Sequence, residues 1–245
     1  MAGDRGWGMH LCVSVLRPLA FALTRQDWAG LENLPADGGY VLAVNHTSQF
    51  DFLAVSHFVH DAAGPPRFLI KSELFGNPIL AKILTSAGQI PVYRRSATAA
   101  DALAAAEEAV RGGECVVVYV EGTLTRDPNL WPMRGKTGAA RIALATGCPV
   151  IPVAQWGAQE VLLPYARRAH LLPRKTMRVR VGPRVDLSDL RSEPITPTSP
   201  REATDRIVSA ITAELESIRG EQAPAERYDP RATKRSGGAS SGGLR

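Results

Sequence analysis

Hydrophobic and polar positions divide the chain into short apolar runs and longer amphipathic segments, which alternate. The apolar runs predict strands over residues 40–44, 67–70, 89–93, 114–120, 150–156 and 177–181. Apolar residues that recur every three or four positions predict helices over residues 50–60, 77–87, 97–111, 135–146 and 201–219. This alternation predicts an α/β fold with a largely parallel, mixed sheet flanked by helices. Ligands in such folds bind beyond the carboxyl ends of the strands.

The segment 7–23, WGMHLCVSVLRPLAFAL, is strongly apolar, but it is too short and too often interrupted by polar residues to predict a transmembrane span. His10, Ser14, Arg17 and Thr24 recur at helical spacing and leave a wide apolar face, as in a helix that lies in a membrane interface. A helix packed on its own domain is an equally open interpretation. A cleaved signal peptide is a third, although no small-residue cleavage site follows.

The chain is long enough for one substantial domain, since it has 245 residues of which 44% are hydrophobic. We expect this domain to cover residues 30–220, and residues 1–29 to form an amphipathic, membrane-associating helix. From Glu221 the sequence is rich in Pro, Gly, Ser and Arg and has nothing to bury. Residues 221–245 are therefore predicted to form a disordered tail.

The charge balance narrows the possible partners. A formal charge of +5 favours a phosphate-bearing partner or another anionic surface. Aromatic residues make up only 6% of the chain and the arginines are scattered, so we expect no nucleic-acid partner. The three cysteines lack CxxC spacing, which indicates reduced thiols of an intracellular protein.

The stretch from Val41 to Leu53, VLAVNHTSQFDFL, places His46 at the exit of a strand and Asp51 at the start of a helix. An imidazole there can accept a proton from a hydroxyl, and a nearby carboxylate can hold its other nitrogen protonated. The two side chains can meet only if His46 lies in the loop and Asp51 in the first helical turn. The alternative is that both residues merely cap the ends of the strand and the helix.

Three other strands carry unusual residues. The strand in 88–95, GQIPVYRR, ends in arginines, and Arg94 there is suited to phosphate or is simply surface charge. The apolar strand in 116–126, VVVYVEGTLTR, runs into Glu121, which needs a partner such as Arg94 unless this is an ordinary turn. Segment 148–153, CPVIPV, contains two prolines, so it is predicted to be an edge strand, an irregular strand or the wall of a cleft.

Together these motifs resemble the glycerolipid acyltransferase family that includes the 1-acyl-sn-glycerol-3-phosphate acyltransferases. The Asn-His-x4-Asp pattern, GQIPVYR, VEGT and CPVIPV occur in the family's order, within residues Gly30 to Gly157. The resemblance implies a glycerol-3-phosphate acyltransferase-like fold, with residues 30–220 as the acyltransferase domain. It also implies direct acyl transfer without a covalent acyl-enzyme, without a cofactor and without a metal.

The resemblance also assigns roles to individual residues. His46 would be the general base and Asp51 would orient it, while Arg94 would bind the acceptor's phosphate. Glu121, Gly122 and Thr123 would help to position the phosphoglycerol.

Two details of the family pattern concern residues farther along the chain. Pro152 and its neighbours would shape the acyl-side cleft. The family's arginine directly after the Thr is absent here, because Leu124 stands in its place. Arg126, or Arg134 and Lys136, could supply the missing charge.

The implied reaction transfers a fatty acyl chain from acyl-CoA or acyl-carrier protein to lysophosphatidic acid, giving phosphatidic acid. The expected partners are therefore the acyl thioester donor, the lysophospholipid acceptor, the membrane surface and acyl carrier protein. We expect a peripheral protein on the cytoplasmic face of the cell membrane. The alternatives are another lysolipid or glycolipid acceptor, or a non-catalytic lipid-binding protein on the same fold.

A metal-dependent hydrolase is a rival hypothesis from a different class. His57 and His60 are three residues apart on one predicted helix and could hold a metal with Asp61. A fourth ligand and a known ligand spacing are missing, so a partly buried helix face is the preferred interpretation.

Overall fold

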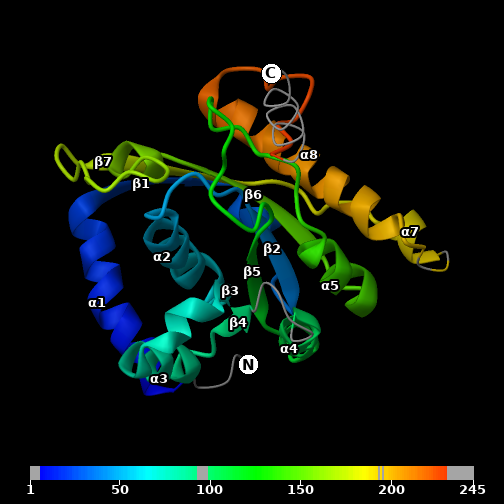
Figure 1. Ribbon diagram of the computed structural model, residues 1–245, viewed down its shortest axis with the longest axis horizontal. Coiled ribbons are helices and arrows are strands. Elements are labelled where there is room, and N and C mark those ends of the chain that lie inside the picture. The colour runs from blue at the N-terminus through cyan, green and yellow to red at the C-terminus, as the bar shows by residue number, and fades with distance from the viewer. Residues whose placement is uncertain (1–5, 93–98, 193, 195, 231–245) are drawn as a thin grey trace, which may run out of the picture.

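The computed structural model describes residues 6–92, 99–192, 194 and 196–230, which form a seven-stranded sheet between layers of helices (Figure 1). The strand order is β1-β7-β6-β2-β5-β3-β4, and in the described part of the chain neighbouring strands run parallel except β6 and β7. The strands are β1 (Thr24–Ala29), β2 (Tyr40–Val44), β3 (Arg67–Lys71), β4 (Ile90–Val92), β5 (Cys115–Tyr119), β6 (Val150–Trp156) and β7 (Lys175–Val181). The predicted α/β fold with a largely parallel, mixed sheet is confirmed.

Helices cover both faces of this sheet. On one face α2 and α3 pack on the strands and α1 packs on α2 and α3; the other face carries α4, α5 and α8. The long helices are α1 (Trp7–Leu23), α2 (Asp51–Ala63), α3 (Pro78–Ser86), α4 (Ala99–Arg111), α5 (Gly138–Thr146) and α8 (Ser199–Arg219). The short ones are η1 (Leu31–Asn33), η2 (Ser72–Gly76), α6 (Ala158–Val161) and α7 (Ser188–Ser192).

Strand β2 is buried on both faces, which explains its uninterrupted apolar sequence. Val41 and Ala43 pack toward α4, α5 and α8, whereas Leu42 and Val44 pack toward α2 and α3. All four side chains have no exposed surface. The core therefore fixes the position of the carboxyl end of β2, where Asn45 and His46 follow.

Local sequence sets the helix boundaries. At the start of α3 the Asn77 side chain accepts hydrogen bonds from the backbone N–H groups of Ile79 and Leu80, and Pro78 occupies the first turn. At the end of α5, Gly147 adopts φ 74°, a left-handed conformation that favours glycine.

Strand β1 was not predicted. Because it belongs to the sheet, the domain includes residues 24–29, which were expected to lie before it. Its residues Thr24–Ala29 pair in parallel with β7 at one edge of the sheet. An edge strand is half exposed and carries polar side chains, so TRQDWA has no apolar run to reveal it. Asp27 is paired with Arg180 of β7 at 3.0 Å.

The expectation of an edge or irregular strand for CPVIPV was wrong, because β6 lies inside the sheet between β7 and β2. The Pro152 carbonyl accepts a hydrogen bond from Gly182 N–H at 2.9 Å. The backbone nitrogen and carbonyl of Pro152 therefore face β7 and not β2. The antiparallel register with β7 begins only at Val153. The missing N–H of Pro152 therefore costs β6 no hydrogen bond to β2.

The first part of the predicted disordered tail also differs from expectation. Residues 221–230 lie along α8, where Ala223 N–H donates to Glu216 at 2.7 Å and the Tyr228 carbonyl accepts from Arg134 N–H at 3.2 Å. Ala223 adds an apolar contact to a cluster around Trp131. Residues 231–245 lie outside the described residues.

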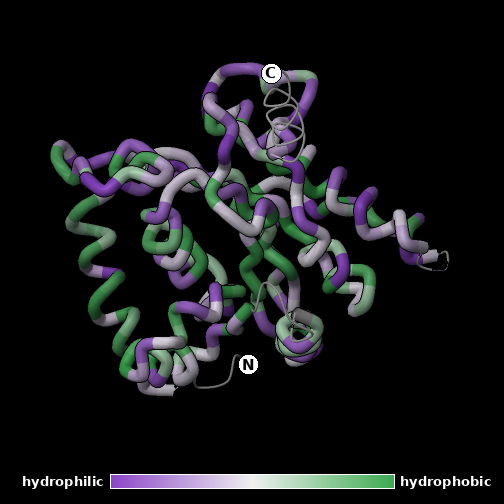
Figure 2. Tube along the Cα trace, viewed as in Figure 1, coloured by the Kyte–Doolittle hydropathy of each residue, from purple (hydrophilic) through white to green (hydrophobic). Residues whose placement is uncertain are grey.

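Figure 2 shows that most of helix α1 is apolar. Met9 and Ala20 are buried against the domain, while Trp7, Leu11 and Val15 form an outward stripe with 43–57% of their surface exposed. Packing on the domain therefore leaves most of the apolar face uncovered. No helix in the described ranges is long and apolar enough to cross a membrane.

Candidate active site

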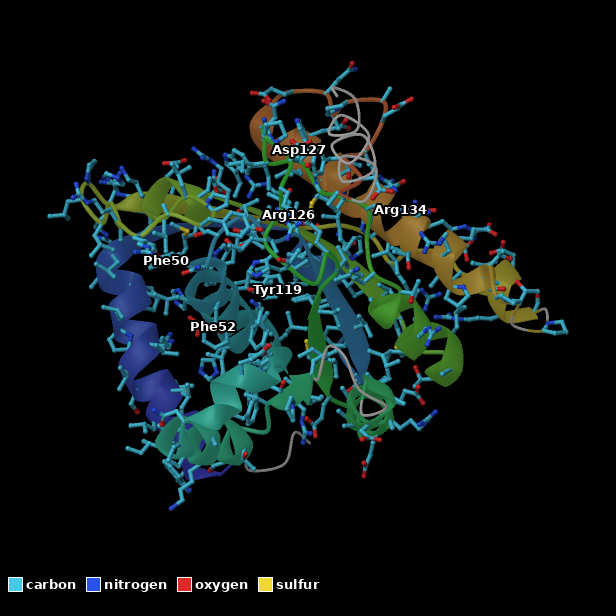
Figure 3. All side chains as sticks on the ribbon, in the orientation of Figure 1. Phe50, Phe52, Tyr119, Arg126, Asp127 and Arg134 are labelled. Atoms are coloured by element: carbon cyan, nitrogen blue, oxygen red, sulfur yellow. The ribbon has the colours of Figure 1, made fainter. Side chains whose placement is uncertain are left out.

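The predicted catalytic residues gather where β2 and β5 end. The two strands are parallel neighbours, with Val44 opposite Tyr119, so the segments that follow them meet at one edge of the sheet. Figure 3 shows Tyr119 close to Phe50 and Phe52 at the start of α2, with Arg126 and Asp127 on the segment that follows β5. The site therefore lies at the carboxyl ends of the strands, as predicted for an α/β sheet.

His46 and Asp51 meet as the pattern predicts. His46 Nδ1 lies 2.9 Å from Asp51 Oδ2, and Asp51 is completely buried. The same oxygen accepts the backbone N–H groups of Thr47 at 2.6 Å and Ser48 at 2.9 Å. The carboxylate therefore holds the loop and the imidazole together through charge-assisted hydrogen bonds. Because Nδ1–H is donated to Asp51, Nε2 carries the free lone pair that a general base needs.

Tyr119 fixes the plane of the imidazole. The rings of His46 and Tyr119 stack with centroids 4.1 Å apart and an interplanar angle of 18°. Burial raises the pKa of Tyr119 well above its usual value, so this ring stays neutral. The His46 side chain keeps 20% of its surface exposed, which leaves it open to a substrate.

Glu121 joins two loops instead of facing solvent. Its side chain is 1% exposed, and its two oxygens accept the backbone N–H groups of His46 and Met133, both at 3.0 Å. Burial raises the pKa of Glu121 to about 8, against the lowering effect of these two donors. Glu121 is therefore buried next to the backbone of His46, with both carboxyl oxygens bonded to N–H groups.

Arg94, the expected partner of Glu121 and of the acceptor phosphate, lies outside the described residues.

The segment from Gly122 to Lys136 closes one side of the site. Thr125 N–H donates to the His46 carbonyl at 2.8 Å, so the segment is bonded directly to the loop that carries the imidazole. Gly122 has φ 65°, and a Cβ there would lie 3.2 Å from the Lys136 side chain. Lys136 is exposed and its N–H donates to the Val120 carbonyl at 2.7 Å. Lys136 therefore lies directly beside the Glu-Gly-Thr motif.

The other two candidate cations lie differently. Arg126 is exposed, and the two residues between it and the motif, Leu124 and Thr125, are buried. Arg134 points to the C-terminal segment, where it forms an ion pair with Asp229 at 3.0 Å (Figure 3). Of the three, Lys136 is both beside the motif and not engaged by a carboxylate in the described ion pairs.

Arg219 at the end of α8 contacts the segment from Gly122 to Lys136. Its guanidinium lies between the rings of Trp131 and Trp156, 3.9 and 4.5 Å from their centroids. It also donates to the Asn129 carbonyl at 2.8 Å. Because Trp131 is only two residues from Met133, this contact supports the backbone that binds Glu121.

Sequence reasoning missed the clasp between Asn45 and Gln155. The Asn45 amide donates to the Gln155 carbonyl at 3.0 Å and accepts Gln155 N–H at 2.8 Å, while Gln155 Nε2 donates to Thr47 at 3.0 Å. All three residues are buried. The clasp ties the carboxyl end of β2 to β6, and its signal was a lone Gln within the apolar strand VIPVAQW.

An apolar pocket lies between α1, α2, β3 and α3. Its walls include Cys12 and Leu16 of α1, Phe52 of α2 and Phe68 of β3. Phe68 lies 5.1 Å from Phe52 and 6.2 Å from Tyr119 between ring centroids. A row of aromatic rings therefore connects the imidazole to the pocket. Pro152, expected to shape such a cleft, is buried in β6 and does not line this pocket.

Two residues of the hypothetical metal site, His57 and Asp61, are engaged in other contacts. His57 is buried against the rings of Phe21 and Trp28, at 4.4 and 5.1 Å between centroids. Asp61 lies 3.4 Å from His57 and forms an ion pair with Arg17 at 2.8 Å, and burial lowers the pKa of His57. Across the described ranges, no group of three or more His, Cys, Asp or Glu is placed to hold a metal ion.

The chain is similar in sequence to curated acyltransferases. A 1-acyl-sn-glycerol-3-phosphate acyltransferase of Brassica napus chloroplasts, BAT2, is 31% identical over 140 residues, covering 56% of this chain and 39% of the relative. The enzyme of that name from Bacillus subtilis is 29% identical over 126 residues, covering 51% of this chain and 60% of its own length. The chain thus spans about two fifths of the length of several curated relatives.

A solved structure shows the same fold. The crystal structure of the 1-acyl-sn-glycerophosphate (LPA) acyltransferase PlsC from Thermotoga maritima matches with a TM-score of 0.64 and 20% identity, covering 88% of this chain and 81% of that one. Residues 25–156, more than half of the chain, match the family model described as Acyltransferase. The chain therefore belongs to the acyltransferase family.

Proposed function

We propose that the protein transfers a fatty acyl chain from a thioester to the free hydroxyl of lysophosphatidic acid, giving phosphatidic acid. The observation that carries this proposal is the buried Asp51 carboxylate bonded to His46 Nδ1 in a site open to solvent. The curated relatives with named activities are 1-acyl-sn-glycerol-3-phosphate acyltransferases, which supports this acceptor.

In the proposed mechanism His46 Nε2 accepts the proton of the acceptor hydroxyl as its oxygen attacks the thioester carbonyl. Asp51 holds the other nitrogen protonated and stabilises the imidazolium that forms. The tetrahedral intermediate collapses, the carbon–sulfur bond breaks, and the leaving thiolate takes the proton from His46. The donor, acyl-CoA or acyl-carrier protein, is a substrate, so the reaction requires no cofactor.

The acceptor phosphate needs cations near the Glu-Gly-Thr motif. Lys136 is our candidate for the charge that Leu124 does not supply, because its stem lies beside Gly122 and its side chain is exposed. Arg94 would add a second contact from the segment after β4. Cations that hold the phosphate would orient the hydroxyl toward Nε2.

The apolar parts of the substrates also have candidate positions. The pocket lined by Leu16, Phe52 and Phe68 is connected to the imidazole through the ring of Tyr119 and has almost no polar wall, which suits an acyl chain. The exposed stripe of Trp7, Leu11 and Val15 on α1 suits a membrane interface. We therefore place the protein peripherally on the cytoplasmic face of the cell membrane, where acceptor and product reside.

A substrate panel tests this proposal. Purified protein in mixed micelles receives labelled acyl-CoA or acyl-carrier protein, with lysophosphatidic acid, lysophosphatidylcholine or lysophosphatidylglycerol as the acceptor. We expect product mainly with lysophosphatidic acid. Product mainly with another lysolipid would identify that lysolipid as the acceptor and leave the proposed mechanism unchanged. No product with any pair would favour the non-catalytic lipid-binding alternative.

A further inference from the structure

A second exposed apolar surface lies away from α1, in the loop between α6 and β7. This α6–β7 loop, residues 162–174, has the sequence LLPYARRAHLLPR. Leu163, Tyr165 and Leu172 expose 55%, 57% and 79% of their surface, and Leu171 exposes 39%. Large apolar side chains clustered in one exposed loop mark an interaction surface, whereas single ones are ordinary.

The same loop is strongly basic. Arg167, Arg168, His170 and Arg174 are exposed, Lys175 follows, and no Asp or Glu occurs between residues 161 and 175. Within the part of the chain that the structure describes, neither Arg167 nor Arg168 forms an ion pair. Apolar side chains interleaved with unpaired cations complement a surface that offers both anionic phosphates and hydrocarbon.

The loop is bonded at its base to the active site. The Leu162 carbonyl accepts a hydrogen bond from Ser48 Oγ at 2.6 Å, only two residues from His46. Tyr165 Oη donates to the Leu124 carbonyl at 3.1 Å, directly after the Glu-Gly-Thr motif. These two bonds hold the first residues of the loop against the loop that carries His46 and the segment after the Glu-Gly-Thr motif.

The loop also adjoins the C-terminal end of α1. The Arg174 guanidinium donates to the carbonyls of Phe21 and Thr24, at the end of that helix. Figure 1 shows the loop beyond the start of β7, beside the end of α1, and Figure 2 shows apolar segments in both. The loop is therefore bonded both to the C-terminal end of α1 and to the loop that carries His46.

We infer that the α6–β7 loop is a second membrane-docking element, which inserts Leu171 and Leu172 into an anionic bilayer while Arg167 and Arg168 bind lipid phosphates. This inference rests on the proposed function, because it delivers a bilayer lipid to the site. An acidic carrier protein is the main competing occupant of a basic loop. The 79% exposure of Leu172 favours the bilayer, since hydrocarbon covers apolar side chains more fully than a charged protein surface does.

Sedimentation with lipid vesicles, without any substrate, tests this inference. The vesicles are phosphatidylcholine alone or phosphatidylcholine with phosphatidylglycerol, and the variants are Arg167→Glu/Arg168→Glu and Leu171→Ser/Leu172→Ser. The matched controls are Arg141→Glu/Arg201→Glu on exposed positions of α5 and α8, and Leu31→Ser on η1, which is 43% exposed. All changed side chains are exposed, so we expect each variant to fold, as circular dichroism would verify.

We expect the arginine variant to bind phosphatidylglycerol vesicles at least on the order of thirtyfold more weakly, about fivefold for each arginine lost from an anionic surface. The leucine variant should bind both kinds of vesicle more weakly, and both controls should bind like the parent. Loop variants that bind like the parent would overturn the inference. Vesicle binding that is retained while binding to purified acyl carrier protein falls would assign the loop to the carrier protein instead. Because no substrate is present, failed acyl transfer overturns the proposed function without affecting this result.

Discussion

The pKa of Glu121 makes a testable prediction about stability and pH. Burial raises this pKa from 4.5 to about 8, so the folded protein keeps a proton that the unfolded chain loses above pH 4.5. Stability from this group is therefore fully present below pH 4.5 and is lost as the pH rises toward about 8. Each pH unit within that window should cost on the order of 1 kcal/mol, so the loss between pH 5 and pH 7 should be on the order of 2–3 kcal/mol.

The assay is urea unfolding of the parent and Glu121→Gln at several pH values from 5 to 9. Glutamine does not titrate, so subtracting the two pH profiles removes the contribution of every other group. Glutamine also presents an NH2 group to one of the N–H donors of His46 or Met133, and the variant should be less stable than the parent at pH 5. The difference between the two proteins should then shrink as the pH rises. Parallel profiles from pH 5 to pH 8 would refute the reasoning, because they would mean that Glu121 is ionised throughout.

Three further predictions concern single side chains. Asp51→Asn should keep the fold but lower kcat on the order of 10²–10⁴-fold, because the amide no longer fixes the tautomer of the imidazole; unchanged kcat in a steady-state assay would exclude the orienting role. Lys136→Ala should raise KM for lysophosphatidic acid roughly tenfold with a smaller change in kcat, whereas Arg126→Ala should leave this KM unchanged. A larger rise of KM in Arg126→Ala than in Lys136→Ala would assign the phosphate contact to Arg126. Arg219→Met should lower the free energy of unfolding by about 1–3 kcal/mol and Arg219→Lys by less, and equal stability of all three proteins in urea would deny that the stack between two Trp rings supports the loop.

The sequence predicted the parts of the fold that depend on burial alone. Strand β2 and the turn after it were recognised because a strand buried on both faces is apolar throughout and ends where polar residues begin. His46 and Asp51 were paired because only one arrangement of a loop and a first helical turn lets them meet. Strand β1 was missed because an edge strand needs no apolar run.

Other features depend on contacts between distant residues, which periodicity does not encode. Glu121 was expected to need a partner, and within the described residues two backbone N–H groups bond to it. Which N–H groups lie nearby is set by the tertiary fold. The clasp of Asn45 with Gln155 joins residues 110 positions apart. Residues 221–230 were predicted to be disordered because they bury little, yet hydrogen bonds to Glu216 and Arg134 position them.

The role of His46 is the central claim, and one measurement tests it most directly. Parent and His46→Ala proteins are compared in mixed micelles with lysophosphatidic acid and labelled acyl-CoA, after urea unfolding has shown that both are folded. The account predicts phosphatidic acid from the parent and a rate roughly 10²–10⁴-fold lower from the variant. A folded His46→Ala protein that forms phosphatidic acid at the parent rate would contradict it.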